Sequence, residues 1–190
     1  MTRSALACLL LGASLSAHAE EIADESRLRR FELPNRDTLE LTLPAGWVEH
    51  VEQPEGGGPP TLEISITEGG PRQVFVTPEW PDPLAKELRE LPSLRDAVRD
   101  MAERTQPQAV EPYLEVRQLD GANGTGFYFA ATDRNPGTDE FRFMHQGALL
   151  VGDLTLWFTV LTNEGQDTIA VEALAMLQTA VHRRTGLDQL

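Results

Sequence analysis

The stretch that decides the fold is LTLWFTVL, residues 154–161, which has bulky side chains at odd and even positions alike. Successive side chains of a strand point to opposite faces of a sheet, so this run predicts a central strand that is covered on both faces. Gly152 and Asp153 stand immediately before it and are typical of a two-residue hairpin turn. The run 141–151 before that turn therefore predicts the partner strand of a long hairpin.

Shorter runs of alternating apolar and polar residues predict further strands. TLELTL, residues 38–43, alternates throughout, and residues 47–51 can pair back on it across a turn at 44–46. Other strands are expected at 62–66, 73–76, 114–119 and 125–132.

Two apolar stripes at helical spacing predict two helices. The first helix begins at Ser93, where Ser93 and Asp96 resemble a capping box. The second spans residues 167–184, with a buried stripe of Ala170, Leu174, Leu177 and Val181. Because strands joined by short turns are antiparallel, the pattern predicts an α+β fold, a mostly antiparallel sheet with helices packed on it.

Residues 1–19 have the three parts of a secretory signal peptide. Arg3 supplies the positive start, an apolar run follows, and the small residues Ala17 and Ala19 precede a cleavage site before Glu20. Cys8 lies inside the apolar run, so it is expected to be lost with the signal peptide. The predicted organisation is a signal peptide at 1–19, a flexible lead-in at 20–35 and a single α+β domain at 36–190.

Composition excludes several classes of function. The cleaved chain would contain no cysteine, and therefore no thiol nucleophile, thiolate metal site or redox couple. The formal charge of the whole chain is −14, which makes nucleic acid and anionic lipid poor partners. No second long apolar run follows residue 19, so we expect no membrane insertion after cleavage. Lys86 is the lone lysine beside many arginines, which suggests a GC-rich bacterial genome and a location in the periplasm or the medium.

The turn LTLPAGW, residues 41–47, and the C-terminal hairpin 141–161 with its following helix carry a family resemblance. They resemble the PsbP-like fold, an α/β/α sandwich shared by photosystem II extrinsic proteins, a Ran-binding nuclear import factor and bacterial secretion-effector chaperones. The resemblance covers about residues 38–184, without the glycine-rich segment 55–60 or the proline-rich segment 77–83. Since the family has no shared catalytic residues, it implies a binding or accessory module.

One loop has the composition of a cation site. Asp133, Asn135 and Asp139 can present oxygen atoms to a single hard cation, and Pro136 and Gly137 would help the backbone to curl. These residues predict a Ca²⁺ site, and an ordinary solvated hairpin loop is the alternative. No other cofactor is indicated.

The remaining motifs do not indicate an enzyme. His50, His145 and His182 lie on separate elements without ligand spacing, and His145 is interpreted as a packed or rim histidine with a hydrogen bond. GANGTG, residues 121–126, predicts a tight turn rather than a phosphate loop, because a strand follows it and it lacks a lysine. Neither a nucleophile elbow nor a zinc-protease motif is present.

Trp80 stands between Pro78 and Pro81, which predicts a stiff, extended surface segment over residues 77–83. A rigid exposed tryptophan loses little entropy on binding and is common among interface hot spots. Trp80 is therefore the candidate anchor for a partner protein, and the alternative is that it covers the edge of the sheet.

Three functions remain open from the sequence. The first is an exported accessory protein that contacts another exported or envelope protein. The second is a small-molecule or lipid binder with a pocket between sheet and helix, and the third is a hydrolase with an unrecognised site. A concave apolar pocket would favour the second function, whereas a paired histidine and carboxylate in a cleft would favour the third.

The export prediction has a direct test. Mass spectrometry of the protein recovered from its native host should find Glu20 at the N-terminus, because cleavage follows Ala19. An intact Met1 or a lipid-modified Cys8 would contradict it.

Overall fold

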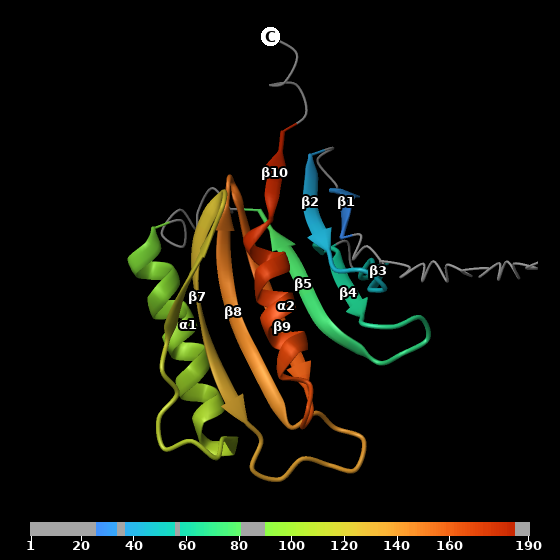
Figure 1. Ribbon diagram of the computed structural model, residues 1–190. Coiled ribbons are helices and arrows are strands. Elements are labelled where there is room, and N and C mark those ends of the chain that lie inside the picture. Colours follow the sequence, from blue (N-terminus) through green and yellow to red (C-terminus); the bar gives the residue numbers. More distant parts are fainter. Residues whose placement is uncertain (1–25, 34–36, 56–57, 81–89, 185–190) are drawn as a thin grey trace, which may run out of the picture.

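The computed structural model describes residues 26–33, 37–55, 58–80 and 90–184 (Figure 1), so the predicted signal peptide lies outside the described residues. The strands are β1 (Arg27–Glu32), β2 (Thr38–Leu43), β3 (Val48–Glu52), β4 (Thr61–Ser65), β5 (Arg72–Glu79), β6 (Arg117–Gly121), β7 (Gly124–Thr132), β8 (Phe143–Val151), β9 (Leu154–Thr162) and β10 (Val181–Arg183). The helices are α1 (Leu91–Thr105), the short 3₁₀ helix η2 (Gln106–Gln108) and α2 (Asp167–Gln178).

In the described part of the chain, a seven-stranded sheet forms the centre, in the order β3-β4-β5-β9-β8-β7-β6. Each neighbouring pair in it is antiparallel, which confirms the α+β class with a mostly antiparallel sheet. The predicted central strand is confirmed as well, since β9 has three strands on either side. Gly152 makes the turn between β8 and β9 with φ of 58°, a conformation that glycine adopts without strain.

The two faces of β9 belong to two separate core clusters. Its even-numbered residues, which include Leu156 and Phe158, are buried in a cluster with α2 and β2. Trp157 points to the other face and packs with Leu94 of α1 and Phe129 of β7. The helices α1 and α2 therefore cover opposite faces of the sheet (Figure 1).

A second, three-stranded sheet of β1, β2 and β10 packs with α2 on one of these faces. Two sequence predictions are wrong here. Residues 27–32 belong to the expected flexible lead-in, yet they pair with the whole of β2 as strand β1. Strand β3 pairs with β4 rather than back on β2, because the turn at 44–46 carries the chain from the small sheet to the large one. Alternation shows which side of a strand is buried but does not name its partner.

Both helices begin or end away from their predicted limits. Helix α1 starts at Leu91 with Glu90 as its N-cap, so the capping box of Ser93 and Asp96 is wrong. A proline in the first turn marks this start instead, as the fixed φ of proline favours. Helix α2 ends at Gln178 rather than at residue 184, because residues 181–183 pair with β2 as strand β10. Neither helix is long and apolar enough to cross a membrane.

The His182 side chain links β10 to the turn between β8 and β9 and to Asp37, the residue before β2. Its side chain is 2% exposed, and its Nδ1 accepts a hydrogen bond from the Asp153 backbone N–H at 3.3 Å. Because Nδ1 accepts, Nε2 carries the proton and donates it to the Asp37 carboxylate at 3.1 Å. His182 is therefore a packed, hydrogen-bonded histidine with a structural role.

Helix α2 offers a test of the core packing. Leu177 is fully buried, Leu174 is partly buried, and Val171 is 66% exposed. Leu177→Ala should lower the free energy of unfolding by about 2–5 kcal/mol because it leaves a cavity. Leu174→Ala should cost less, and Val171→Ala should stay within about 0.5 kcal/mol. Urea unfolding measures all three, and equal losses at 171 and 177 would contradict this orientation of α2.

Candidate functional site

A groove lies between α2 and the outer strands of the large sheet. Helix α2 begins beside the end of β9, and its last residue, Gln178, donates a hydrogen bond from Nε2 to the Asp120 carbonyl on β6 at 2.6 Å. The helix therefore crosses the sheet obliquely, and part of β7 and β8 stays uncovered on this face. The uncovered region is an open cavity of about 340 Å³.

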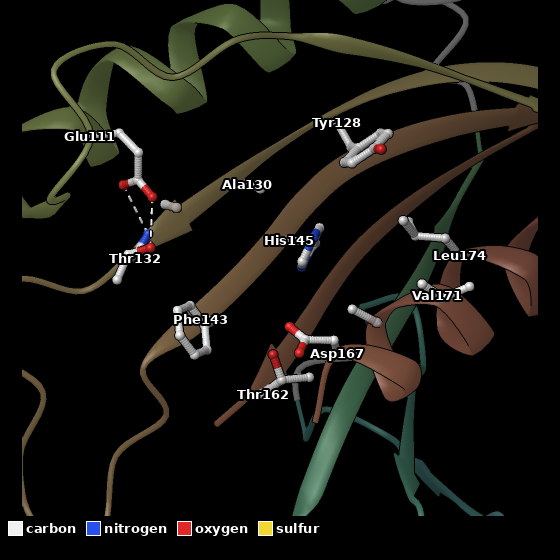
Figure 2. Close-up of a pocket in the computed structure, with 12 residues that line it drawn as sticks. Glu111, Tyr128, Ala130, Thr132, Phe143, His145, Thr162, Asp167, Val171 and Leu174 are labelled. Atoms are coloured by element: carbon white, nitrogen blue, oxygen red, sulfur yellow. Dashed lines mark hydrogen bonds between the residues drawn. The ribbon is translucent and has the colours of Figure 1, made fainter. Parts of the chain in front are cut away.

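Alternate residues of two strands form the floor of this groove, and α2 forms one wall (Figure 2). On β8, the side chains of Phe143 and His145 face the groove. Gly147 is next on the same side of the strand, and it leaves room for Tyr128, because a Cβ at Gly147 would lie 2.7 Å from the Cβ of Tyr128. The twelve residues that line the groove are Glu111, Tyr128, Ala130, Ala131, Thr132, Phe143, His145, Thr162, Asp167, Ala170, Val171 and Leu174.

His145 lies at the middle of the groove, between the strands and α2 (Figure 2). Its ring centroid is 6.1 Å from that of Tyr128, with an interplanar angle of 31°. Its Nδ1 is inaccessible to solvent and has no hydrogen-bond partner among the residues that the structure describes. The sequence predicted a hydrogen-bonded histidine here, and for Nδ1 that prediction is wrong. Burial lowers the pKa of His145, and the positive charge of Arg117 lowers it further, so the ring is neutral at pH 7.

Glu111 closes one end of the groove. Its Oε2 accepts the backbone N–H of Thr132 at 3.0 Å, and its Oε1 accepts the Thr132 hydroxyl at 2.6 Å. Burial raises the pKa of Glu111, but the hydrogen bonds from Thr132 outweigh that effect, and the net result is a lowered pKa. Glu111 therefore holds a negative charge at this end.

Asp167 contributes a second carboxylate from the first turn of α2, where the helix dipole favours a negative charge. Figure 2 shows its side chain directed into the groove near Thr162 and below His145. Tyr128 and Phe143 supply aromatic surface, and Val171 and Leu174 supply aliphatic surface. The site thus combines an apolar floor and wall with two carboxylates and a neutral imidazole.

The predicted Ca²⁺ residues are placed in the loop between β7 and β8. The Asp133 carboxylate accepts the Asn135 backbone N–H at 2.8 Å, and Glu140 accepts the Gly137 backbone N–H at 2.8 Å. Within residues 26–33, 37–55, 58–80 and 90–184, no group of three His, Cys, Asp or Glu side chains is arranged to hold a metal ion. A turn closed by its own side chains accounts for this spacing.

Trp80 follows the end of β5, and the neighbouring Pro78 lies inside that strand, paired with Leu156. The indole is partly buried against the core cluster shared by the sheet and α2, and its Nε1 is inaccessible to solvent. This is the arrangement of a side chain that covers the sheet, the alternative that the sequence left open. Residues 81–83 of the predicted contact segment lie outside the described residues.

Sequence reasoning did not find Glu111, Asp167 or Tyr128. The signal for part of the groove was the period of two, which places Phe143 and His145 on one face of β8. The alternation of β7 likewise places Tyr128, Ala130 and Thr132 on one face. The alternation of side chains along a strand does not show that α2 leaves this face of the sheet open.

Comparisons with known proteins support the fold alone. No family model matches the chain, and no curated protein matches it. Three chains of solved structure match. One is a crystal structure at 1.50 Å resolution of a protein from Bacteroides thetaiotaomicron VPI-5482, with 12% identity and a TM-score of 0.51. The match covers 83% of this chain and 49% of that one, so this chain spans about half the length of that protein.

The pKa of His145 gives a prediction for protein stability. The folded pKa lies below the ordinary histidine value of 6.5, so the unfolded chain binds a proton in the window between the two values and the folded protein does not. The free energy of unfolding should therefore fall as the pH drops below 6.5 towards the folded pKa. NMR titration of the ring protons measures the pKa, and urea unfolding across this range measures the loss.

The variant His145→Gln should remove this part of the pH dependence, whereas His50→Gln, at an exposed position of β3, should leave it unchanged. A His145 pKa above 6.5, or the same pH dependence in His145→Gln as in the parent protein, would show that the ring is not desolvated in the groove.

Proposed function

We propose that this protein is an exported binding protein that holds a small molecule in the groove between α2 and strands β7 and β8. The observation that carries the proposal is the open cavity of about 340 Å³, in which apolar side chains lie beside His145 and the carboxylates of Glu111 and Asp167. Buried polar atoms in proteins are almost always hydrogen-bonded, and an unpaired one costs about 1–3 kcal/mol. The Nδ1 of His145 is such an atom, but it is inaccessible to solvent, so a ligand in the open groove would contact the other lining groups.

The character of the lining favours a compact ligand over a lipid tail. Small-molecule sites typically have cavities of about 300–1,000 Å³ with a few convergent polar groups on an apolar surface, and this groove lies at the small end of that range. An acyl chain would cover the carboxylates of Glu111 and Asp167 with apolar surface, which is unfavourable for a charged group.

A hydrolase receives less support from the same residues. His145 and Asp167 line one cavity, but no hydrogen bond joins Nδ1 of His145 to any described residue. A general base needs such an orienting partner and a nucleophile within hydrogen-bond reach. The described lining offers Tyr128, Thr132 and Thr162 as hydroxyls, and the Thr132 hydroxyl already donates to Glu111.

Contact with another exported or envelope protein is the second candidate. It is favoured by strand β3, which forms an edge of the described seven-stranded sheet and exposes Val48 and Val51. An unpaired strand edge can receive a strand from a partner. Export itself rests on the features of residues 1–19, and an α/β/α sandwich of the PsbP-like kind is our proposal for the finer fold, supported by helices on opposite sheet faces.

A fragment screen observed by NMR tests the groove. Fragments that bind the protein should shift the backbone amide signals of Ala130, His145 and Val171, because these residues line one cavity. Ala130→Phe should abolish these shifts, since the added ring occupies the groove. The melting temperature of Ala130→Phe should stay close to that of the parent, since Ala130 is only partly buried.

The matched control is Val110→Phe, which adds a similar ring at an exposed position outside the groove and should leave binding intact. Binding that persists in Ala130→Phe, or shifts confined to β3, would contradict the groove as the ligand site and favour the edge-strand candidate.

A further inference from the structure

We propose that the ligand of this groove is a small organic cation, an amine or guanidinium group joined to an aromatic or aliphatic body. The inference deepens the proposed function and rests on it. It is carried by the charge, the aromatic surface and the hydrogen-bonding capacity of the residues that line the cavity.

Among the described residues that line it, the groove has negative charge at separated points and no positive charge. Among its twelve lining residues are the carboxylates Glu111 and Asp167, and none is a lysine or an arginine. Burying an anion in a groove with two carboxylates is unfavourable, whereas a cation gains a favourable interaction with the carboxylate that it contacts.

Two arginines near the groove, Arg117 and Arg142, have acidic partners outside it. Arg117, whose charge acts on His145, pairs with Glu115 at 3.3 Å. Arg142 pairs with Glu164 at 3.8 Å. Neither arginine lines the cavity, so the carboxylates that do line it keep their capacity for a ligand.

Glu111 is prepared to receive a charged donor. The two hydrogen bonds from Thr132 occupy one lone pair on each carboxylate oxygen and hold the group in one orientation. A carboxylate has about four acceptor positions, so both oxygens can accept one more hydrogen bond. Charge-assisted hydrogen bonds of this kind are roughly twice as strong as neutral ones.

The floor of the groove suits the rest of such a ligand. The face of an aromatic ring attracts cations. The Arg142 guanidinium already lies 5.9 Å from the centroid of the Phe143 ring, so Phe143 would contact the apolar body of the ligand rather than its charge. Tyr128 offers a second ring, and Val171 and Leu174 offer aliphatic surface on the opposite wall. An amine with an aromatic or branched body would therefore contact both walls.

His145 completes the site without opposing a cation. Its ring is neutral because burial and Arg117 lower its pKa, so it does not repel a positive ligand at neutral pH. The imidazole therefore adds no positive charge to the lining of the groove.

Three matched probes test the ligand class: 2-phenylethylamine, 2-phenylethanol and phenylacetate. They share one ring and a short spacer and differ in charge, so their dissociation constants, measured from the amide shifts of Ala130, His145 and Val171, isolate the effect of charge. The amine should bind at least about tenfold more tightly than the alcohol, because hydrogen bonds to charged groups are stronger. Phenylacetate should bind more weakly than either.

Two variants locate the effect. Asp167→Asn and Glu111→Gln should each bring the affinity of the amine close to that of the alcohol and leave the affinity of the alcohol unchanged. Glu172→Gln changes the net charge equally on the same helix but outside the groove, and should alter neither affinity by more than about twofold. If Glu111→Gln unfolds because its contacts to Thr132 are lost, Asp167→Asn decides.

The possible outcomes distinguish a preference for cations from small-molecule binding in the groove as such. Alcohol or phenylacetate binding in the groove as tightly as the amine would overturn the cation preference and leave a binding groove. An amine preference that Glu172→Gln removes as fully as Asp167→Asn would also overturn it, because the protein's overall charge would then be the cause. Shifts from none of these probes and from no screened fragment would overturn the binding groove itself.

Discussion

Burial of β9 on both faces is the constraint on which the rest of the structure depends. A strand with bulky side chains on each side leaves apolar surface in water unless both faces are covered. Helix α1 covers the face of Trp157, and α2 covers the face of Leu156 and Phe158, together with the small sheet of β1, β2 and β10. The C-terminal strand β10 and the His182 hydrogen bonds hold that small sheet and the β8–β9 turn together.

The same constraint explains why a groove exists beside α2. The first turn of α2 lies beside the end of β9, whereas its last residue, Gln178, donates a hydrogen bond to Asp120 of β6. Because α2 crosses the sheet obliquely, it does not cover the whole face. The end of β7 and the beginning of β8, around Thr132 and Phe143, stay open. The residues there include Thr132 and His145, polar groups that a closed core would not tolerate without partners.

A site built in this way has a rigid floor and polar groups at defined positions. Tyr128, Phe143 and His145 are held by strands paired on both sides, and Glu111 is held by its two hydrogen bonds to Thr132. Preorganised groups of this kind lower the entropy that binding costs. We therefore propose the groove, rather than the segment around Trp80, as the contact site of this protein, since Trp80 is partly buried against the core.

Much of the fold follows from local pattern, because residues close in the chain determine it. The central strand, the hairpin at Gly152 and the tight turn at 121–126 depend on alternation and on glycine, which act over a few residues. The pairing of β3 with β4, the use of residues 27–32 as β1 and the early end of α2 were not foreseen. Each depends on partners far away in sequence, which a period of two does not specify.

The features of the candidate site also fall into those that follow from local sequence and those that depend on distant contacts. The sequence by itself determined that Phe143 and His145 share a face, that the chain is strongly acidic, and that no thiol chemistry is available to the chain after residue 19. Only the tertiary structure decided that this face stays open, that Glu111 and Asp167 come to line the cavity beside it, and that Trp80 turns towards the core. The physical reason is that strand periodicity is a property of neighbouring residues, whereas a cavity arises where distant elements fail to cover one another.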